Sequence, residues 1–127
     1  MLPILLVFVG AGIGGVLRHF VNVLGPRVFG AGFPAGTMLV NISGSLLIGV
    51  IVGWLAFRVQ SPWSPNLRLF AVTGMLGGFT TFSAFSLDFA LLVERGELGA
   101  AVVYVAGSVG LSLVAVFAGL AFVRAMA

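Results

Sequence analysis

The segment from Gly74 to Ser86 reads GMLGGFTTFSAFS and decides how this chain folds. It lies within an apolar run long enough to cross a bilayer, yet many of its residues weaken a helix. Gly77 and Gly78 each lower helix propensity by about 1 kcal/mol relative to alanine. Thr80 and Thr81 are β-branched, and their hydroxyls compete for backbone hydrogen bonds. Because non-helical backbone at membrane depth needs protein or a polar cavity around it, a break in this segment indicates a functional site rather than an anchor.

The composition of the chain is that of a membrane protein. Of its 127 residues, 61% are hydrophobic and 7% are charged, and its mean hydropathy is +1.26. At about 20 residues per span, this length allows four helices with short loops. We therefore expect an all-α integral membrane protein in which residues 1–127 form a single four-helix domain. The absence of cysteine excludes disulfides, thiolate metal sites and cysteine nucleophiles.

Four apolar stretches mark the expected spans. Their approximate limits are Leu2–Leu24, Pro34–Phe57, Leu67–Val93 and Leu98–Val123. The first stretch lacks a positive n-region and is too long for a signal peptide, so we interpret it as a retained helix that ends at the turn Gly25-Pro26. Trp54 and Trp63 are expected to anchor the second span and the following loop at the membrane interface.

A glycine-rich motif in the first span imitates a nucleotide-binding fingerprint. Residues 10–15 fit the pattern G-x-G-x-x-G, but a dinucleotide site needs an acidic residue about 20 positions further on. The first acid in this chain is Asp88, so the match is a false positive. Gly10 and Gly14 instead indicate a close contact between helices.

Two polar residues lie near the expected end of the first span. Arg18 either extends its guanidinium to the lipid headgroups or supplies a vestibule charge that attracts anions to a pore. His19 is interpreted as an interfacial residue.

The second span carries small and polar residues at every fourth position. They are Thr37, Asn41, Ser45, Gly49 and Gly53, and this spacing places them along one helical stripe. A packing seam with Asn41 as hydrogen-bonding glue explains the glycines. It explains Asn41 less well, because a buried amide brings two donors and an acceptor that all need partners. Both interpretations of Asn41, packing and function, remain open at this stage.

The third and fourth spans each repeat one kind of residue. An aromatic stripe in the third span consists of Phe79, Phe82, Phe85 and Phe89, interleaved with hydroxyl residues. Such a stripe faces lipid, packs against another helix or lines a site. Asp88 near the end of this span is interpreted as interfacial. In the fourth span, a line of hydroxyls recurs at every fourth position, at Tyr104, Ser108 and Ser112.

The arginines give no preferred orientation in the membrane. Four spans place Arg58, Arg68 and Arg124 on one side and Arg18, Arg27 and Arg95 on the other. Since the positive-inside rule has no excess to act on, we expect a chain that inserts in both orientations and pairs as an antiparallel homodimer. Broken helices would meet near its axis, where freed carbonyls can bind a cation. The scattered arginines form no basic cluster, so nucleic acid is not an expected partner.

Three motifs together make the chain resemble the Fluc-type fluoride channels, also called the CrcB family. They are Gly14-x-x-x-Arg18, Gly36-Thr37-x-x-Val40-Asn41 and the long segment from Gly77 to Ser86. The resemblance covers the whole chain. It implies a multi-pass protein of the bacterial inner membrane that works as an antiparallel, dual-topology homodimer with two fluoride pores and a central structural Na+.

The resemblance also assigns roles to residues of this chain. Phe82 and Phe85 resemble the aromatic pair along which fluoride passes, and Asn41 resembles the pore amide that faces them. The carbonyls of Gly77 and Thr80 resemble the sodium ligands. Arg18 is similar to the vestibule arginine of the family, and the polar track of the pore is represented by Thr81, Ser83, Tyr104, Ser108 and Ser112. Ala84 departs from the pattern, since some relatives carry a hydroxyl there.

The expected function is passive export of fluoride, which prevents its accumulation in the cytoplasm. The alternative is a small dual-topology exporter that couples efflux of cationic compounds to protons. Such an exporter requires a carboxylate in the middle of the membrane, whereas the one acid within a predicted span is Asp88, near the end of the third span. A non-conducting scaffold would leave the Phe and Thr segment without purpose, and a single histidine offers no nucleophile–base pair for an enzyme.

Overall fold

The computed structural model describes residues 1–57, 62 and 64–126, and these residues are helical apart from short connections. The elements are α1 (Leu2–Phe29), α2 (Ala35–Phe57), α3 (Ser64–Arg68), the π-helical segment η1 (Leu69–Leu76), α4 (Gly77–Phe79), α5 (Phe82–Glu94) and α6 (Leu98–Met126). Four helical stretches are long and apolar enough to cross a membrane: Leu2–Phe29, Ala35–Phe57, Ser64–Glu94 and Leu98–Met126. The prediction of a four-span, all-α membrane protein is confirmed.

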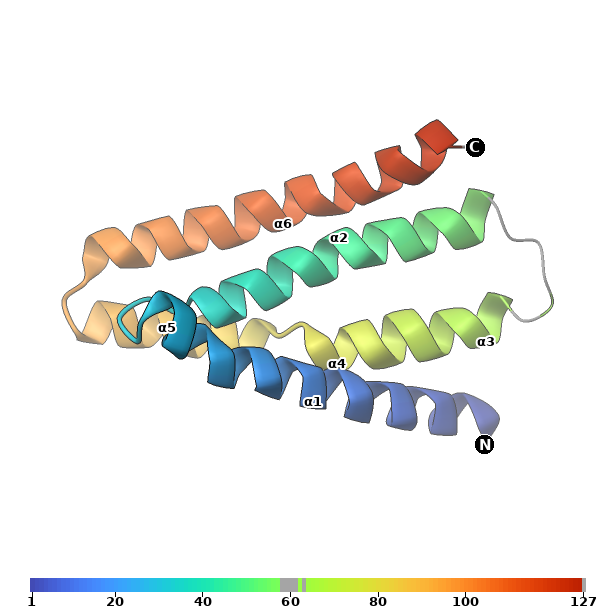
Figure 1. The fold of residues 1–127 in the computed structure, drawn as a ribbon, viewed down its shortest axis with the longest axis horizontal. Helices are drawn as coiled ribbons and strands as arrows, with labels where there is room; N and C mark the ends of the chain where they lie inside the picture. The colour runs from blue at the N-terminus through green and yellow to red at the C-terminus, as the bar shows by residue number, and fades with distance from the viewer. Residues whose placement is uncertain (58–61, 63, 127) are drawn as a thin grey trace.

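The four stretches lie side by side with both termini at the same end (Figure 1). The first and third stretches run in one direction, and α2 and α6 run in the other. The most extensive contacts join α2 to α6 and α1 to η1. The α1–α2 and α5–α6 connections therefore lie at the end of the bundle opposite the termini, as an even number of spans requires.

Glycines bring the backbones of paired helices into direct contact. A Cβ atom on Gly10 would lie 2.5 Å from the Phe70 carbonyl oxygen and 3.0 Å from the Gly74 Cα atom, and one on Gly14 would overlap the Met75 carbonyl. The predicted close contact of the first helix at Gly10 and Gly14 is confirmed. Its partner is the backbone of the third stretch, from Phe70 to Phe79, so α1 fixes the position of that segment.

The third stretch changes conformation repeatedly along its length. It begins at Ser64 rather than Leu67, because Pro65 suits the first helical turn, where its missing N–H needs no partner. The π-helical segment follows, and the helix persists through Gly77, Gly78 and Phe79. Thr80 (φ −78°, ψ 156°) and Thr81 (φ −154°, ψ 123°) are extended, and α5 begins at Phe82. The extended residues are thus the β-branched threonines and not the glycines.

The expected end of the first span is wrong. Gly25 and Pro26 are helical, and α1 ends at Phe29, followed by Gly30, whose positive φ of 85° suits glycine. A proline costs a helix one hydrogen bond and some strain, which a helix in a membrane protein tolerates. Here the bond from Gly30 N–H to the Pro26 carbonyl (3.0 Å) closes the last turn. As a consequence, Arg18 is followed by residues 19–29 of the same helix and does not lie at its end.

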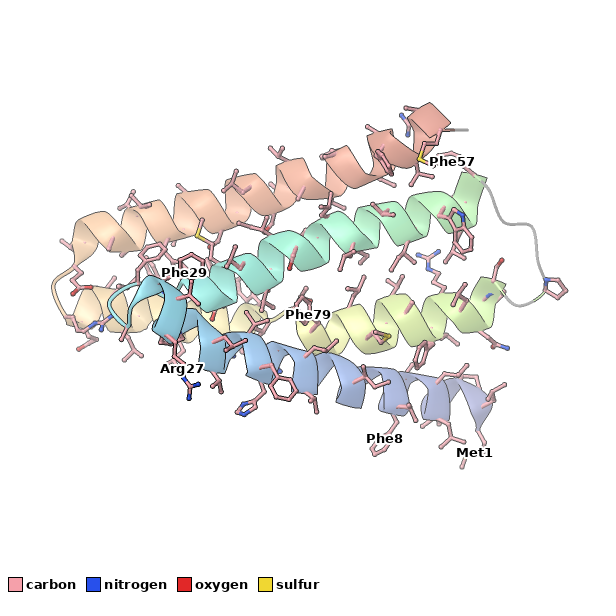
Figure 2. The ribbon with its side chains drawn as sticks, viewed as in Figure 1. Met1, Phe8, Arg27, Phe29, Phe57 and Phe79 are labelled. Carbon is pink, nitrogen blue, oxygen red and sulfur yellow. The ribbon has the colours of Figure 1, made fainter. Side chains whose placement is uncertain are left out.

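The outer surface is apolar and the small core lies near the α5–α6 connection. Side chains such as Phe8 point away from the bundle, while Arg27 lies at the end opposite Met1 (Figure 2). Leu92, Ala101 and Tyr104 form a buried cluster. The fourth helix extends to Met126, three residues beyond the expected Val123. Arg58 and Trp63, which the sequence placed in the interfacial loop, lie outside the described residues.

Candidate functional site

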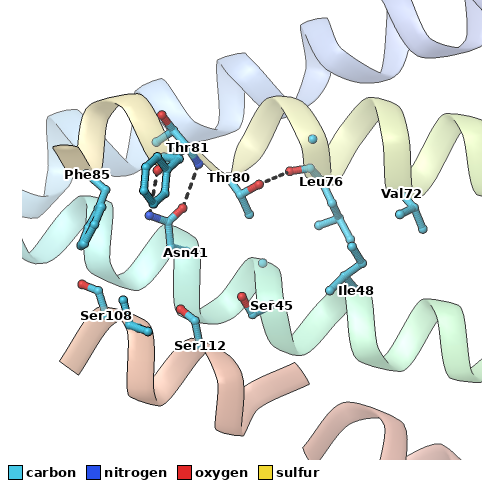
Figure 3. Close-up of a pocket in the computed structure, with 14 residues that line it drawn as sticks. Asn41, Ser45, Ile48, Val72, Leu76, Thr80, Thr81, Phe85, Ser108 and Ser112 are labelled. Carbon is cyan, nitrogen blue, oxygen red and sulfur yellow. Dashed lines mark hydrogen bonds between the residues drawn. The ribbon is translucent and has the colours of Figure 1, made fainter. Parts of the chain in front are cut away.

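A cavity of about 350 Å³ lies beside the extended threonines (Figure 3). It is lined by Asn41, Gly44, Ser45, Ile48, Val72, Leu76, Gly77, Thr80, Thr81, Phe82, Phe85, Ser108, Val109 and Ser112. These residues come from α2, the third stretch and α6, so the cavity exists because three spans meet there. None of these described lining residues is ionisable. The cavity therefore offers dipoles and aromatic rings, but no fixed side-chain charge.

Asn41 binds the backbone of Thr81 through both ends of its amide. Its Oδ1 accepts a hydrogen bond from Thr81 N–H at 2.8 Å, and its Nδ2 donates to the Thr81 carbonyl at 2.9 Å. This pairing satisfies an extended residue in the way that a neighbouring strand would. One N–H of the Asn41 amide is left over from these two bonds, since the group carries two.

The threonine side chains complete the local hydrogen bonding. Thr80 donates both its N–H (2.9 Å) and its hydroxyl (2.8 Å) to the Leu76 carbonyl. The Thr81 hydroxyl accepts from Ala84 N–H at 3.1 Å and so caps the start of α5. Because Thr81, Phe82 and Phe85 line the cavity, the positive end of the α5 dipole opens on it.

Aromatic rings form a contiguous group next to the cavity. The Phe82 and Phe85 centroids are 5.5 Å apart, and those of Phe85 and Tyr104 are 5.2 Å apart. Phe33 meets Tyr104 edge to face at 5.6 Å. Phe85 is thus held between two rings, whereas Phe82 is 78% exposed in the protomer. The exposed ring of Phe82 is therefore accessible to a further partner at the surface of the protomer.

Two serine hydroxyls in the cavity wall have no hydrogen-bond partner among the described residues. Ser108 and Ser112 occupy successive turns of α6, and the Oγ atoms of both are buried and unpartnered within the described part of the chain. Ser108 is 4% exposed. An isolated buried hydroxyl costs about 1 to 3 kcal/mol, so these groups indicate a polar occupant of the cavity, either water or a ligand.

Comparison with known proteins identifies a family. The family model described as CrcB-like protein, Camphor Resistance (CrcB), matches residues 5–120. The chain belongs to the CrcB family.

Relatives in this family carry the name of an ion channel. The chain is 59% identical over 122 residues to "Fluoride-specific ion channel FluC 2" of Nitrobacter hamburgensis, a match that covers 94% of this chain and 95% of the relative. It is 54% identical to "Fluoride-specific ion channel FluC" of Rhodopseudomonas palustris strain BisB5, over 96% of this chain and 97% of the relative. A protein of the same name from Methylobacterium nodulans is 55% identical over 98% of both chains. The predicted membership of the CrcB family is confirmed.

Most residues to which the CrcB resemblance assigned a role, in the fluoride pathway or as sodium ligands, line the cavity. They are Asn41, Gly77, Thr80, Thr81, Phe82, Phe85, Ser108 and Ser112. The positions of these residues in the sequence account for this grouping. The serines of α6 recur at every fourth residue, and the others, apart from Asn41, belong to the single segment around the extended threonines.

Three assigned residues do not line the cavity. Tyr104 is fully buried in the core, and its hydroxyl donates to Asp88 Oδ2 at 3.1 Å. Ser83 is exposed, and its hydroxyl lies 3.2 Å from that of Thr81. Arg18 lies within α1, half-buried, and its Nε has no hydrogen-bond partner among the described residues. Tyr104 and Ser83 therefore contact the wall residues Phe85 and Thr81 from outside the cavity, whereas Arg18 lies on a helix that contributes no lining residue.

The structure adds wall residues to which the sequence had assigned no role in a site. They are Gly44, Ile48, Val72, Leu76 and Val109, together with Ser45, which the sequence placed on the α2 stripe. Ser45 follows Asn41 by one turn, and that spacing was a usable signal. Ile48, Val72 and Val109 resemble any apolar residue of a membrane helix, so no local pattern distinguishes them.

Proposed function

We propose that this CrcB-family chain is a fluoride-selective channel that allows F− to leave the cytoplasm down its electrochemical gradient. One observation carries the proposal. A cavity without ionisable walls presents two unpartnered serine hydroxyls, two phenylalanine rings and the N-terminal end of α5 to a single space. The names of the relatives, which describe fluoride-specific ion channels, support the same function.

These groups suit a small anion that must move. Fluoride is strongly hydrated, so a selective pathway has to replace its water with hydroxyl and amide donors. Ser108, Ser112 and the free N–H of Asn41 are such donors. The positive edges of the Phe82 and Phe85 rings add weak contacts. Several weak sites suit conduction, because an ion that is held too tightly does not leave.

We further propose that the working unit is an antiparallel homodimer with two pores. The large exposure of Phe82 leaves one side of the pathway open in a single protomer, and a second copy would close it. Of the described arginines, Arg68 and Arg124 belong to the end of the bundle that carries the termini, Arg27 and Arg95 belong to the other end, and Arg18 lies within α1. Balanced charges of this kind permit insertion in both orientations.

Na+ is the proposed structural ion of the dimer. Gly77 is the first residue of the three-residue α4 and Thr80 follows its last residue, so both belong to the final turn before the extended backbone, where helix carbonyls lack the donors of a following turn. Gly77 is also exposed, so its backbone is accessible to a second copy. Two carbonyls from each chain give an all-oxygen donor set, which hard cations prefer. When bound, the ion would supply positive charge without a titrating side chain.

Arg18 is proposed as the vestibule charge. It lies one helical turn beyond Gly14, which contacts Met75 and Phe79, so α1 carries it toward the extended threonines. A half-buried guanidinium with a free Nε attracts anions without being neutralised.

Reconstitution in liposomes tests the proposal directly. Vesicles loaded with equal fluoride and chloride should release fluoride, read by a fluoride electrode, while chloride stays inside. Equal release of both ions, or release of neither, rejects the channel. The exporter alternative finds no support in the cavity wall, because Asp88 lies outside it and accepts a bond from Tyr104.

Orientation is tested by forcing it. Two lysines added to the connections at one end of the bundle should fix the topology of every chain, since loop charge decides insertion. Fluoride release should then disappear, and it should return when chains with opposite lysine placements are expressed together. Full release from a single forced orientation rejects the antiparallel dimer.

A further inference from the structure

The two carbonyls proposed as sodium ligands are those whose helical donors bind elsewhere. In a continuous α-helix, the N–H of residue 81 would donate to the Gly77 carbonyl and the N–H of residue 84 to the Thr80 carbonyl. In the structure, Thr81 N–H donates to Asn41 Oδ1 at 2.8 Å, and Ala84 N–H donates to Thr81 Oγ1 at 3.1 Å. A side-chain oxygen thus replaces each carbonyl as the acceptor.

We propose that Asn41 and Thr81 are positioning residues of the cation site. Asn41 Oδ1 keeps the Gly77 carbonyl free, and Thr81 Oγ1 keeps the Thr80 carbonyl free. This inference rests on the proposed function, in which Na+ occupies these carbonyls. It gives both side chains a role that is separate from any contact with fluoride and ties the wall of the anion pathway to the affinity of the cation site.

Contacts on both sides of the threonines hold this arrangement in place. The two hydrogen bonds of Thr80 to the Leu76 carbonyl fix the last turn before the extended residues. The methyl of Thr80 sits against Gly44, where a Cβ would overlap it. Asn41 and Gly44 lie three residues apart on α2 and therefore share one face. On this face, Asn41 holds Thr81 by two hydrogen bonds, and Gly44 leaves space for the methyl of Thr80.

A pair of substitutions at Asn41 separates the cation role from the anion role. Asn41→Asp loses the donor to the Thr81 carbonyl but retains an oxygen that accepts from Thr81 N–H, whereas Asn41→Leu has neither the donor nor the acceptor. Without that acceptor, Thr81 N–H is free to return to the Gly77 carbonyl. We expect Asn41→Leu to weaken Na+ binding about tenfold, the equivalent of losing one hydrogen bond's worth of free energy, and Asn41→Asp to retain it.

The measurement is the Na+ dependence of thermal unfolding of the purified protein in detergent, with N-methylglucamine replacing Na+ at constant ionic strength. A bound ion stabilises the folded state in proportion to the logarithm of its concentration over its dissociation constant. The curve for Asn41→Leu should shift to about tenfold higher Na+ than those of the wild type and Asn41→Asp. Ser43→Ala is the matched control and should not shift the curve, because Ser43 is exposed on α2 and its hydroxyl donates to the Val40 carbonyl, away from the threonines.

Thr81 provides a second pair in case Asn41→Leu fails to fold. Thr81→Val removes the hydroxyl that holds Ala84 N–H and should weaken Na+ binding, whereas Thr81→Ser keeps the hydroxyl and should not. If Na+ stabilises the wild type, and stabilises Asn41→Leu and Thr81→Val over the same concentration range, the positioning role is rejected while the proposed channel stands. If the wild type itself does not respond to Na+, the cation site and this inference both fail, and fluoride release still tests the channel separately.

Discussion

The two halves of α2 make close contacts of opposite kinds. In the first half, Asn41 and Gly44 face the extended threonines through hydrogen bonds and a seated methyl. In the second half, Gly49 and Gly53 face α6, where a Cβ on Gly49 would overlap the Val116 carbonyl. One helix therefore supplies both a polar clamp, formed by Asn41 and Gly44, and a close helix–helix seam, formed by Gly49 and Gly53.

The difference lies in the backbone that α2 meets. Across the seam, α6 satisfies its own amides and carbonyls, so close approach yields only packing. Across the clamp, Thr81 is extended and its backbone groups need external partners. A stripe of small residues is thus not a site by itself. It becomes one where the opposing backbone leaves polar groups without helical partners.

The largest effect is expected from a charge placed in the clamp. Asn41→Asp puts a carboxylate into the proposed anion path, where repulsion should lower fluoride efflux on the order of a hundredfold or more. Efflux from liposomes with a fluoride electrode measures this change, and gel filtration should show dimers as before. Normal efflux at neutral pH would place Asn41 outside the ion path and leave it as a packing residue.

The aromatic pair should have a similarly large effect. Phe82→Ile or Phe85→Ile keeps an apolar side chain but removes the positive ring edge. We expect fluoride efflux to fall by about a hundredfold in each case, because several weak contacts to the ion are lost together. Phe89→Ile is the matched control, because Phe89 lies on α5 but not in the cavity wall. Equal rates for the control and the two pore variants would reject the role of the ring edges.

The features predicted from sequence are those that local chemistry determines. Apolar run lengths predicted four spans, and the spacing of Gly10 and Gly14 predicted a close helix–helix contact, whose partner the structure shows to be the third stretch. The unusual segment from Gly77 to Ser86 contains five of the fourteen residues that line the cavity. The family followed from the same residues.

The features missed depend on partners distant in sequence. Pro26 indicates a turn in isolation, but the helix continues to Gly30, which moved Arg18 away from the end of its span. The pairing of Asn41 with Thr81 joins residues 40 positions apart, so periodicity within one helix does not reveal it. The bond between Tyr104 and Asp88 is likewise tertiary. The sequence placed Tyr104 in the line of hydroxyls of the fourth span and Asp88 at the membrane interface, because each has its partner on the other helix and not on its own.

A smaller effect on efflux, but a clear one on stability, is expected at the seam. In Gly119→Ala, the new Cβ would lie 2.5 Å from the Leu46 carbonyl oxygen, so α2 and α6 must separate. We expect a loss of about 1 to 3 kcal/mol in the free energy of unfolding, with efflux per folded protein little changed. Gly99→Ala, where nothing lies within 4 Å, is the control and should be neutral or stabilising. Loss of efflux without loss of stability would mean that the seam, and not the clamp alone, shapes the pathway.

The smallest effect is expected at Tyr104, and it decides between two roles for that residue. The family resemblance places the hydroxyl in the polar track, whereas in the structure it binds Asp88 outside the cavity wall and the ring supports Phe85. Tyr104→Phe keeps the ring, so efflux should fall by no more than about fivefold, which corresponds to less than the free energy of one hydrogen bond. Tyr104→Leu removes the ring and should lower efflux further, because Phe85 then loses the surface against which it packs. If Tyr104→Phe stops efflux as completely as Phe82→Ile, the hydroxyl itself contacts the ion, and its bond to Asp88 must break as the ion passes.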